Sequence, residues 1–250
     1  MDDREHSLWI KRFDPAPSAG VRLACLPHAG GAASYFLPVS RALAGDCEVL
    51  AVQYPGRQER RHEPHIGDVA ELAHRIAEEL LAWTDRPLAL FGHSMGSTVG
   101  FEVARVLEAK GCAPVALLAS GRRAPSRPRV EAVHRLPDAG LVDALTSMQG
   151  TSADLLADPE ILELILPTIR ADYRAIESYR YEPGAPLSAP IHAFLGDNDP
   201  QVTVDEAEAW REHTTADFGL HLYRGGHFYL NTHAAAVIAE IRDILALPAR

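Results

Sequence analysis

Residues 88–97 read Leu-Ala-Leu-Phe-Gly-His-Ser-Met-Gly-Ser, and this stretch decides the fold that we expect. Four apolar residues, enough for a short buried strand, run directly into Gly-x-Ser-x-Gly and then into a segment with apolar residues at helical spacing. A strand that is followed at once by a helix needs a tight turn, and Gly92 and Gly96 omit the side chains that would keep the two elements apart. The pattern predicts a nucleophile elbow with Ser94 at its tip.

The helix that follows Ser94 is expected to direct its unpaired amide groups back toward the serine. The backbone N–H of Met95 would then stabilise negative charge on an oxygen whose carbon is under attack. Gly-x-Ser-x-Gly alone is a weak signal, because an ordinary turn between a buried strand and a buried helix can have the same residues. The interpretation therefore depends on partner residues elsewhere in the chain.

A second loop with suitable backbone amides follows residues 21–26, which have the composition of a buried strand. The loop reads Pro-His-Ala-Gly-Gly over 27–31, and a His-x-Gly-Gly loop after a core strand resembles the second half of an oxyanion hole. We assign the second oxyanion donor to the amide of Ala29. The alternative interpretation is a flexible turn before the helix expected around 34–44.

A candidate acid follows the strand predicted at 191–195, in the sequence Gly-Asp-Asn-Asp-Pro over 196–200. A carboxylate on the turn after a late strand is where an α/β-hydrolase places the acid of its catalytic triad. Asp199 is our choice for this acid. Asp197 is the alternative, although its position next to Gly196 favours a role in the turn itself.

The candidate general base is His227, which lies in a Gly-Gly-His loop after the last predicted strand at 220–223. The chain order Ser94, Asp199, His227 is that of α/β-hydrolases and differs from the trypsin-like and subtilisin-like orders. Three residues in this order, each on the expected kind of turn, make an inert loop histidine a poor explanation.

The strand and helix signals alternate over most of the chain, which predicts right-handed βαβ units and a mostly parallel sheet with helices on both faces. We therefore expect one α/β-hydrolase domain over residues 1–250. The strand signal disappears over about 122–188, where helical patterns are broken by prolines. We expect a helical lid insertion there; a helical pack that does not move is the alternative. The predicted strands lie at 21–26, 48–53, 88–91, 114–120, 191–195 and 220–223.

Composition excludes several function classes. The net charge of −10 argues against a nucleic-acid binder. We expect no membrane span and a cytoplasmic protein, since the charged start lacks the apolar region of a secretory signal and no apolar run could cross a bilayer. Histidines and carboxylates show no metal-ligand spacing, so we expect no metal. Three cysteines without CxxC spacing predict buried free thiols at Cys25, Cys47 and Cys112.

Arginines crowd one stretch of this acidic chain, at Arg122, Arg123, Arg127 and Arg129. Such runs are usually solvated loops. On an acidic protein, however, they could also form a docking patch for an acidic partner.

The motifs at 27–31, 92–96, 196–200 and 225–229, at these separations in a chain of 250 residues, resemble the type II thioesterases that accompany polyketide synthases and nonribosomal peptide synthetases. The similarity covers nearly the whole chain and is weakest across 122–185. It implies hydrolysis of stalled or wrong acyl groups from the phosphopantetheine arm of acyl or peptidyl carrier proteins, without a cofactor of the enzyme's own. Carrier proteins are generally acidic, which makes the arginine stretch a plausible contact.

Two other functions use the same scaffold. A general serine esterase or acyl hydrolase that acts on small esters or acyl-CoA would need the same three residues as the thioesterase. If the protein used this scaffold only for binding, we would expect the triad to be incomplete. This sequence keeps all three residues of the triad.

Overall fold

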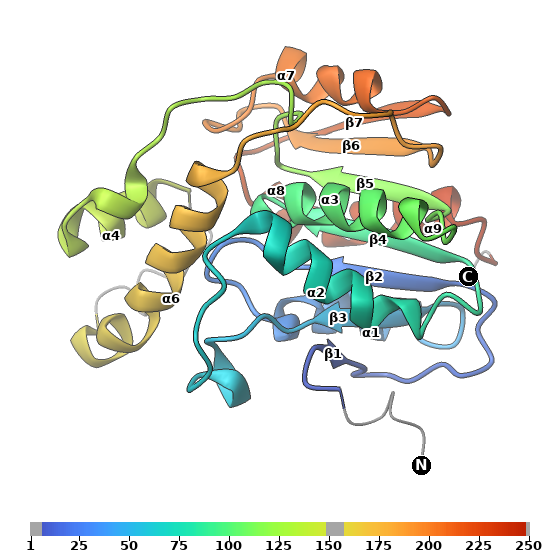
Figure 1. The fold of residues 1–250 in the computed structure, drawn as a ribbon, viewed down its shortest axis with the longest axis horizontal. Coiled ribbons are helices and arrows are strands. Elements are labelled where there is room, and N and C mark those ends of the chain that lie inside the picture. The colour runs from blue at the N-terminus through green and yellow to red at the C-terminus, as the bar shows by residue number, and fades with distance from the viewer. Residues whose placement is uncertain (1–6, 149–157, 249–250) are drawn as a thin grey trace.

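The structure is a computed structural model that describes residues 7–148 and 158–248. These residues form a seven-stranded sheet in the order β1-β3-β2-β4-β5-β6-β7 (Figure 1). β1 runs antiparallel to β3, and all other neighbouring strands are parallel. The mostly parallel sheet is therefore confirmed, although the two-residue edge strand β1 was not predicted. The strands are β1 Ile10–Lys11, β2 Arg22–Leu26, β3 Glu48–Val52, β4 Leu88–His93, β5 Ala116–Ser120, β6 Ile191–Gly196 and β7 Phe218–Tyr223.

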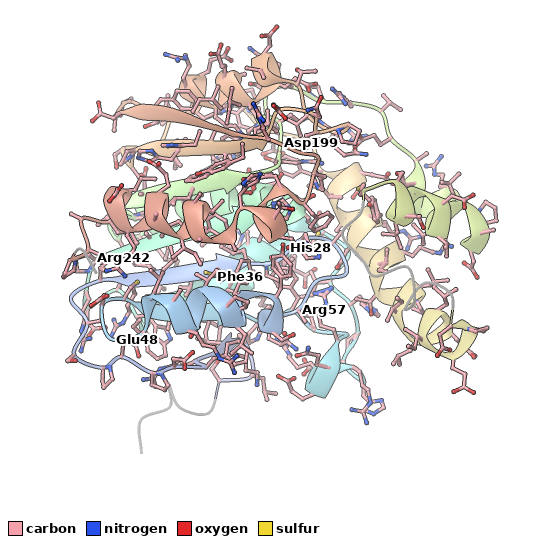
Figure 2. All side chains as sticks on the ribbon, turned by 180° about the vertical axis from the view of Figure 1, so that it is seen from behind. His28, Phe36, Glu48, Arg57, Asp199 and Arg242 are labelled. Atoms are coloured by element: carbon pink, nitrogen blue, oxygen red, sulfur yellow. The ribbon has the colours of Figure 1, made fainter. Side chains whose placement is uncertain are left out.

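Helices cover both faces of the sheet, as the alternating sequence pattern predicts. α2 and α3 lie on the face toward the viewer in Figure 1, and α1 and α9 lie on the opposite face, which Figure 2 shows. Each face has its own apolar core. The helices are η2 Ala33–Phe36, α1 Leu37–Leu43, η3 Gln58–Arg60, α2 Val69–Leu81, α3 Met95–Ala109, η4 Val133–Arg135, α4 Asp138–Met148, α6 Pro159–Ser178, α7 Val204–Glu208, η5 Ala209–His213, α8 Tyr229–Thr232 and α9 Ala234–Ile244.

The turn between β4 and α3 has the close approach that its glycines predict. A Cβ atom on Gly92 would lie 2.1 Å from the carbonyl oxygen of Gly96, and one on Gly96 would lie 2.1 Å from that of Leu26 in the neighbouring strand. Ser94 between them has φ 54° and ψ −118°, a conformation that L-residues seldom adopt. The surrounding packing thus holds the serine in a strained turn at the carboxyl end of a central strand.

The helices of the predicted insertion lie beyond the carboxyl ends of the parallel strands (Figure 1). α4 and α6 share a small apolar cluster. Part of the predicted insertion, residues 149–157, lies outside the described residues, and the motion of a lid stays a prediction. The apolar cluster is formed by Leu141, Leu145, Leu166 and Ile169.

The cysteine prediction is correct for two of the three residues. Cys25 and Cys47 are buried free thiols. Cys112 is only half-buried, and it lies three residues beyond the end of α3. None of the helices in the described part of the chain has the length and apolar character needed to cross a bilayer.

We expect Gly96→Ala to destabilise the protein strongly, because its Cβ atom would overlap a backbone carbonyl that cannot move without disturbing β2. Overpacking of this kind costs about 3 kcal/mol or more, which corresponds to a fall in Tm of roughly 10 °C for a chain of this size. Gly100→Ala is the matched control on the same helix, since its nearest neighbour would be a side-chain carbon at 3.4 Å. Thermal unfolding of both variants tests this, and equal Tm values would contradict it.

Candidate active site

Loops at the carboxyl ends of β2, β4 and β7 meet at one cavity of about 230 Å³. Ala29 follows β2, Ser94 and Met95 follow β4, and His227 follows β7, and all four line this cavity. Helices α4 and α6 form its other wall through Ala144, Ser147, Met148, Tyr173, Ile176 and Glu177. The structure therefore brings together the predicted nucleophile, base and oxyanion donors, and it encloses them with helices from the predicted insertion.

Asp199 and His227 form a buried hydrogen-bonded pair. Nδ1 of His227 lies 2.8 Å from Oδ2 of Asp199, and their side chains are 3% and 0% exposed. The other carboxylate oxygen, Oδ1, accepts the amide of Gln201 at 2.8 Å. Both oxygens of Asp199 (Figure 2) are thus held, so the carboxylate fixes the histidine ring with Nδ1 protonated. Among the described residues Ser94 Oγ makes no hydrogen bond to His227, and such contacts often tighten only when substrate binds.

Asp197, the alternative acid, has different partners. Its Oδ1 accepts the amide of Gly225 at 2.9 Å and the side-chain amide of Asn198 at 2.8 Å. Asp197 therefore joins two turns, as its position next to Gly196 suggests, and Asp199 is the carboxylate that contacts His227.

The two predicted oxyanion donors have amides that the fold leaves available. Met95 is the first residue of α3, so its N–H has no acceptor within the helix. The amide of Ala29 donates to no protein acceptor in the described part of the chain. The loop around Ala29 is held from both sides, because Gly31 donates to the carbonyl of His28 at 2.9 Å and Tyr54 Oη donates to that of Pro27 at 3.2 Å.

Two further histidines surround His227, and the sequence analysis did not identify them. Burial, with the nearby His227 and Arg57 charges, lowers the pKa of His28 to about 3, and burial lowers the pKa of His93 well below its usual range. The His93 and His227 rings have their centroids 5.1 Å apart. Because both neighbours stay neutral, neither adds positive charge beside the proposed base. Their only sequence signal was their place in the two glycine motifs, where His28 begins His-x-Gly-Gly and His93 occupies the first variable position of Gly-x-Ser-x-Gly.

His93 also connects the elbow to a buried polar chain. Its Nδ1 lies 2.9 Å from Ser120 Oγ, which lies 2.7 Å from the hydroxyl of Tyr229. Ser94 donates its amide to the carbonyl of Ser120 at 2.8 Å. The end of β5 therefore supports both the nucleophile turn and the loop that carries His227.

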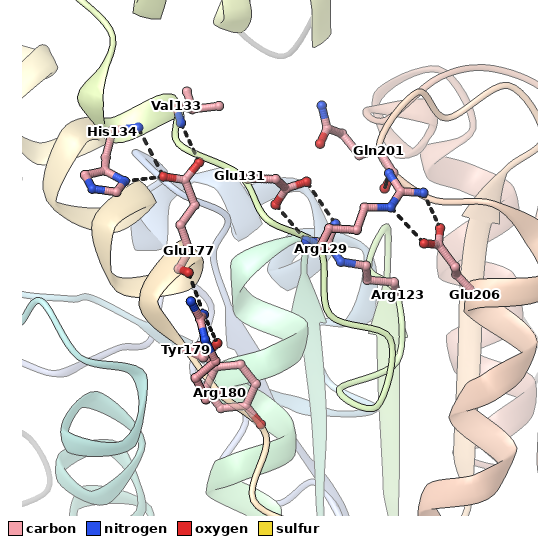
Figure 3. Close-up of polar contacts among 10 residues, drawn as sticks. All are labelled: Arg123, Arg129, Glu131, Val133, His134, Glu177, Tyr179, Arg180, Gln201 and Glu206. Atoms are coloured by element: carbon pink, nitrogen blue, oxygen red, sulfur yellow. Dashed lines mark hydrogen bonds and ion pairs between the residues drawn. The ribbon is translucent and has the colours of Figure 1, made fainter.

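The predicted arginine patch is largely neutralised within the chain. Arg123 bonds Glu131 and Arg129 bonds Glu206, as Figure 3 shows, and Arg127 bonds Glu212. Arg123 is only 5% exposed, so its expected role as a docking residue is not supported. Arg122 is half-buried and lines the cavity, and burial lowers the pKa of its guanidinium to about 10, which leaves it charged at neutral pH.

Within residues 7–148 and 158–248, no three His, Cys, Asp or Glu side chains cluster in a way that could hold a metal ion.

Known proteins share both the sequence and the fold of this chain. The family model of the thioesterase domain matches residues 21–245. Thioesterase PikA5 of Streptomyces venezuelae is 47% identical over 98% of this chain and 89% of its own length. A probable cadicidin biosynthesis thioesterase of Streptomyces griseus is 48% identical over 95% of this chain, which spans 66% of that relative's length.

Solved structures agree with this assignment. The type II thioesterase BorB from the borrelidin biosynthetic cluster has a TM-score of 0.90 and 50% identity, with 96% of this chain and 98% of BorB covered. YbtT, a type II thioesterase from the yersiniabactin NRPS/PKS pathway, has a TM-score of 0.85 and 33% identity, with 94% and 97% covered. The chain therefore belongs to the thioesterase domain family, with the α/β-hydrolase fold that the sequence predicts, and is a serine hydrolase that acts on thioesters.

Proposed function

We propose that this enzyme removes stalled or aberrant acyl groups from the phosphopantetheine arm of acyl or peptidyl carrier proteins during polyketide or nonribosomal peptide biosynthesis. Relatives described as type II thioesterases of such pathways support this role. The observation that carries the chemistry is the buried His227–Asp199 pair in one cavity with the strained Ser94. The enzyme would need no cofactor of its own, because the substrate brings the phosphopantetheine. A cytoplasmic location stays part of the proposal.

In the first half of the reaction, Ser94 Oγ attacks the thioester carbonyl while His227 removes the hydroxyl proton. Asp199 keeps the imidazole in the required tautomer and stabilises its positive charge. The amides of Ala29 and Met95 donate to the tetrahedral oxyanion. Collapse of this intermediate breaks the C–S bond, and the imidazolium gives its proton to the departing thiol, which leaves the acyl group on Ser94.

In the second half, His227 takes a proton from a water molecule that attacks the acyl-enzyme. The same two amides stabilise the second oxyanion, and the proton returns to Ser94 Oγ as the ester bond breaks. One thioester and one water thus give one carboxylic acid and one free thiol. Neutral His28 and His93 suit this cycle, because a fixed positive charge beside His227 would weaken it as a base.

The two neighbouring aspartates give a matched test of the triad. Asp199→Asn should lower kcat on a soluble acyl thioester by roughly 1,000- to 10,000-fold, since the amide no longer holds the reactive tautomer of His227. Asp197→Asn should lower it less than about tenfold, because Asp197 contacts a turn and not the histidine. Ser94→Ala sets the baseline, with a loss of about a millionfold. Steady-state kinetics measures kcat of each variant, and Tm shows that each variant is folded. A larger loss of kcat in Asp197→Asn than in Asp199→Asn would overturn the assignment of the acid.

The substrate class is tested by comparing release of acid from acetyl- or propionyl-loaded carrier protein with hydrolysis of a p-nitrophenyl ester of the same acyl group. Rapid clearing of the carrier that depends on Ser94 supports the editing function. Fast ester cleavage with an untouched carrier would instead support a general serine esterase with the same triad.

We further propose that the carrier docks beside a groove of about 170 Å³ that shares Arg122, Ile176 and Glu177 with the catalytic cavity. A groove continuous with the cavity lining suits the entry of a long pantetheine arm. Arg127 and Arg129 also line it, and their side chains are 40% and 36% exposed, so they are the arginines of the predicted patch that an acidic carrier could contact.

Arg127→Glu and Arg129→Glu should each raise KM for the acyl carrier roughly three- to tenfold and change KM for a soluble acyl thioester less than about twofold. The carrier KM of the unaltered protein should rise with salt more steeply than that of either variant, because screening weakens the same attraction. Arg75→Glu is the control, since this exposed arginine on α2 makes the same charge change outside the groove. Equal effects on both substrates, or on the control, would contradict docking at this groove.

A further inference from the structure

A buried carboxylate on helix α6 contacts the loop that carries the proposed oxyanion donor. Oδ2 of Asp172 accepts the amide of Gly30 at 2.7 Å. The same oxygen lies 2.5 Å from Nη2 of Arg57, which follows β3 (Figure 2). Asp172 is 4% exposed and Arg57 is 6% exposed. One carboxylate oxygen thus joins α6 to two loops of the sheet domain.

This contact controls the peptide next to the oxyanion donor. The amide of Gly30 belongs to the planar peptide unit that joins Ala29 to Gly30, so holding this N–H fixes the rotation of that unit relative to Ala29. α6 also packs directly on the loop, because a Cβ atom on Gly30 would lie 2.6 Å from Cγ1 of Ile169. The direction of the Ala29 amide is therefore coupled to the position of α6.

The Arg57–Asp172 ion pair is expected to contribute little to the stability of the fold. Nε and Nη1 of Arg57 are buried and have no hydrogen-bond partner in the described part of the chain, and the guanidinium stacks on Tyr54 at 5.0 Å from the ring centroid. Desolvation offsets much of the attraction in a buried ion pair, and apolar replacements often leave stability unchanged or improve it. The placement of the pair between α6 and the loop of Ala29 offers a functional explanation for its presence.

We propose that Asp172 is a positioning residue that holds the oxyanion loop in its stabilising conformation through the Gly30 amide, while Arg57 orients the carboxylate. This inference rests on the proposed function, because it takes Ala29 as an oxyanion donor. It assigns α6 a role beyond enclosing the acyl group: the position of this helix sets how well the transition state is stabilised. Anything that shifts α6, such as a docked carrier, would change the rate of the chemical step.

Two double variants separate the hydrogen-bond acceptor from the ion pair. Arg57→Met with Asp172→Leu removes both charges and the acceptor, whereas Arg57→Gln with Asp172→Asn removes the charges and keeps an oxygen for Gly30. We expect the first to lower kcat on a soluble acyl thioester by about 10- to 100-fold with KM within about twofold, a fraction of the loss from deleting a whole donor. The second should stay within about threefold of the unaltered enzyme.

A second readout reports on the oxyanion hole directly. A trifluoromethyl ketone, which forms a reversible tetrahedral adduct with an active serine, should lose affinity in the Met/Leu variant by the same factor as kcat. Thr168→Val is the control for a general loosening of α6. It removes a hydrogen bond of 2.9 Å from the same helix to the carbonyl of Gly56 and leaves the contacts of residues 27–31 intact. It should leave inhibitor affinity unchanged even if Tm falls.

The outcomes distinguish this inference from the proposed function. If Ser94→Ala keeps full activity, the proposed site itself is wrong. A second outcome is that Ser94→Ala is inactive but the two double variants, Arg57→Met with Asp172→Leu and Arg57→Gln with Asp172→Asn, have equal kcat. The positioning role of Asp172 is then overturned, whether both double variants are active or both are impaired. Should the Met/Leu variant fail to fold, Arg57→Gln with Asp172→Ala replaces it, since it also removes the acceptor.

Discussion

The close approach of β4, α3 and β2 is the constraint on which the rest of the site depends. α3 can begin directly after Ser94 only because Gly92 and Gly96 let its first turn touch β4 and the end of β2. β4 is hydrogen-bonded on both sides, to β2 and to β5, and this pairing holds the strained serine in place. Since the flanking strands are parallel, their carboxyl ends lie at the same edge, and this brings together the loops that carry the proposed oxyanion donors, acid and base.

Charge at this edge is arranged so that two of the three histidines near the serine stay neutral. His28 and His93 are kept neutral by burial, and Asp199 has both oxygens occupied by donors. His227 differs from these two rings because, among the described residues, it alone of the three has a hydrogen bond to Asp199.

The sequence predicted the parts of this molecule that are local in the chain. Each proposed site residue follows a short apolar strand within a few positions, so strand order and loop motifs were enough to select Ser94, Asp199 and His227 as candidates, and the structure places all three near one another. Contacts between distant segments left no such signal. Asp172 lies 142 positions from Gly30, and nothing in a helical pattern marks it as a ligand of that amide. The partners of Arg127 and Arg129 lie 85 and 77 positions away, which is why their charges looked available.

Helix α6 shows why the insertion was the least predictable part. Besides apolar packing, hydrogen bonds from three buried polar side chains fix the position of this helix. Thr168 donates to the carbonyl of Gly56, Asp172 accepts the amide of Gly30, and Glu177 accepts the amides of Val133 and His134. Apolar surfaces can slide past one another at small cost, whereas hydrogen bonds lose most of their strength when distance or angle changes.

Such anchors therefore select one position of the helix against several that would bury similar apolar area. Because α6 also lines the cavity, these contacts together define the space left for an acyl group, and the contact from Asp172 also sets the direction of the Ala29 amide. Substrate fit and transition-state stabilisation are then not independent properties of this fold. A substitution that enlarges the cavity by moving α6 would also disturb the oxyanion loop, while one at Ser147 of α4, which lines the cavity outside the apolar cluster shared with α6, would leave that loop alone.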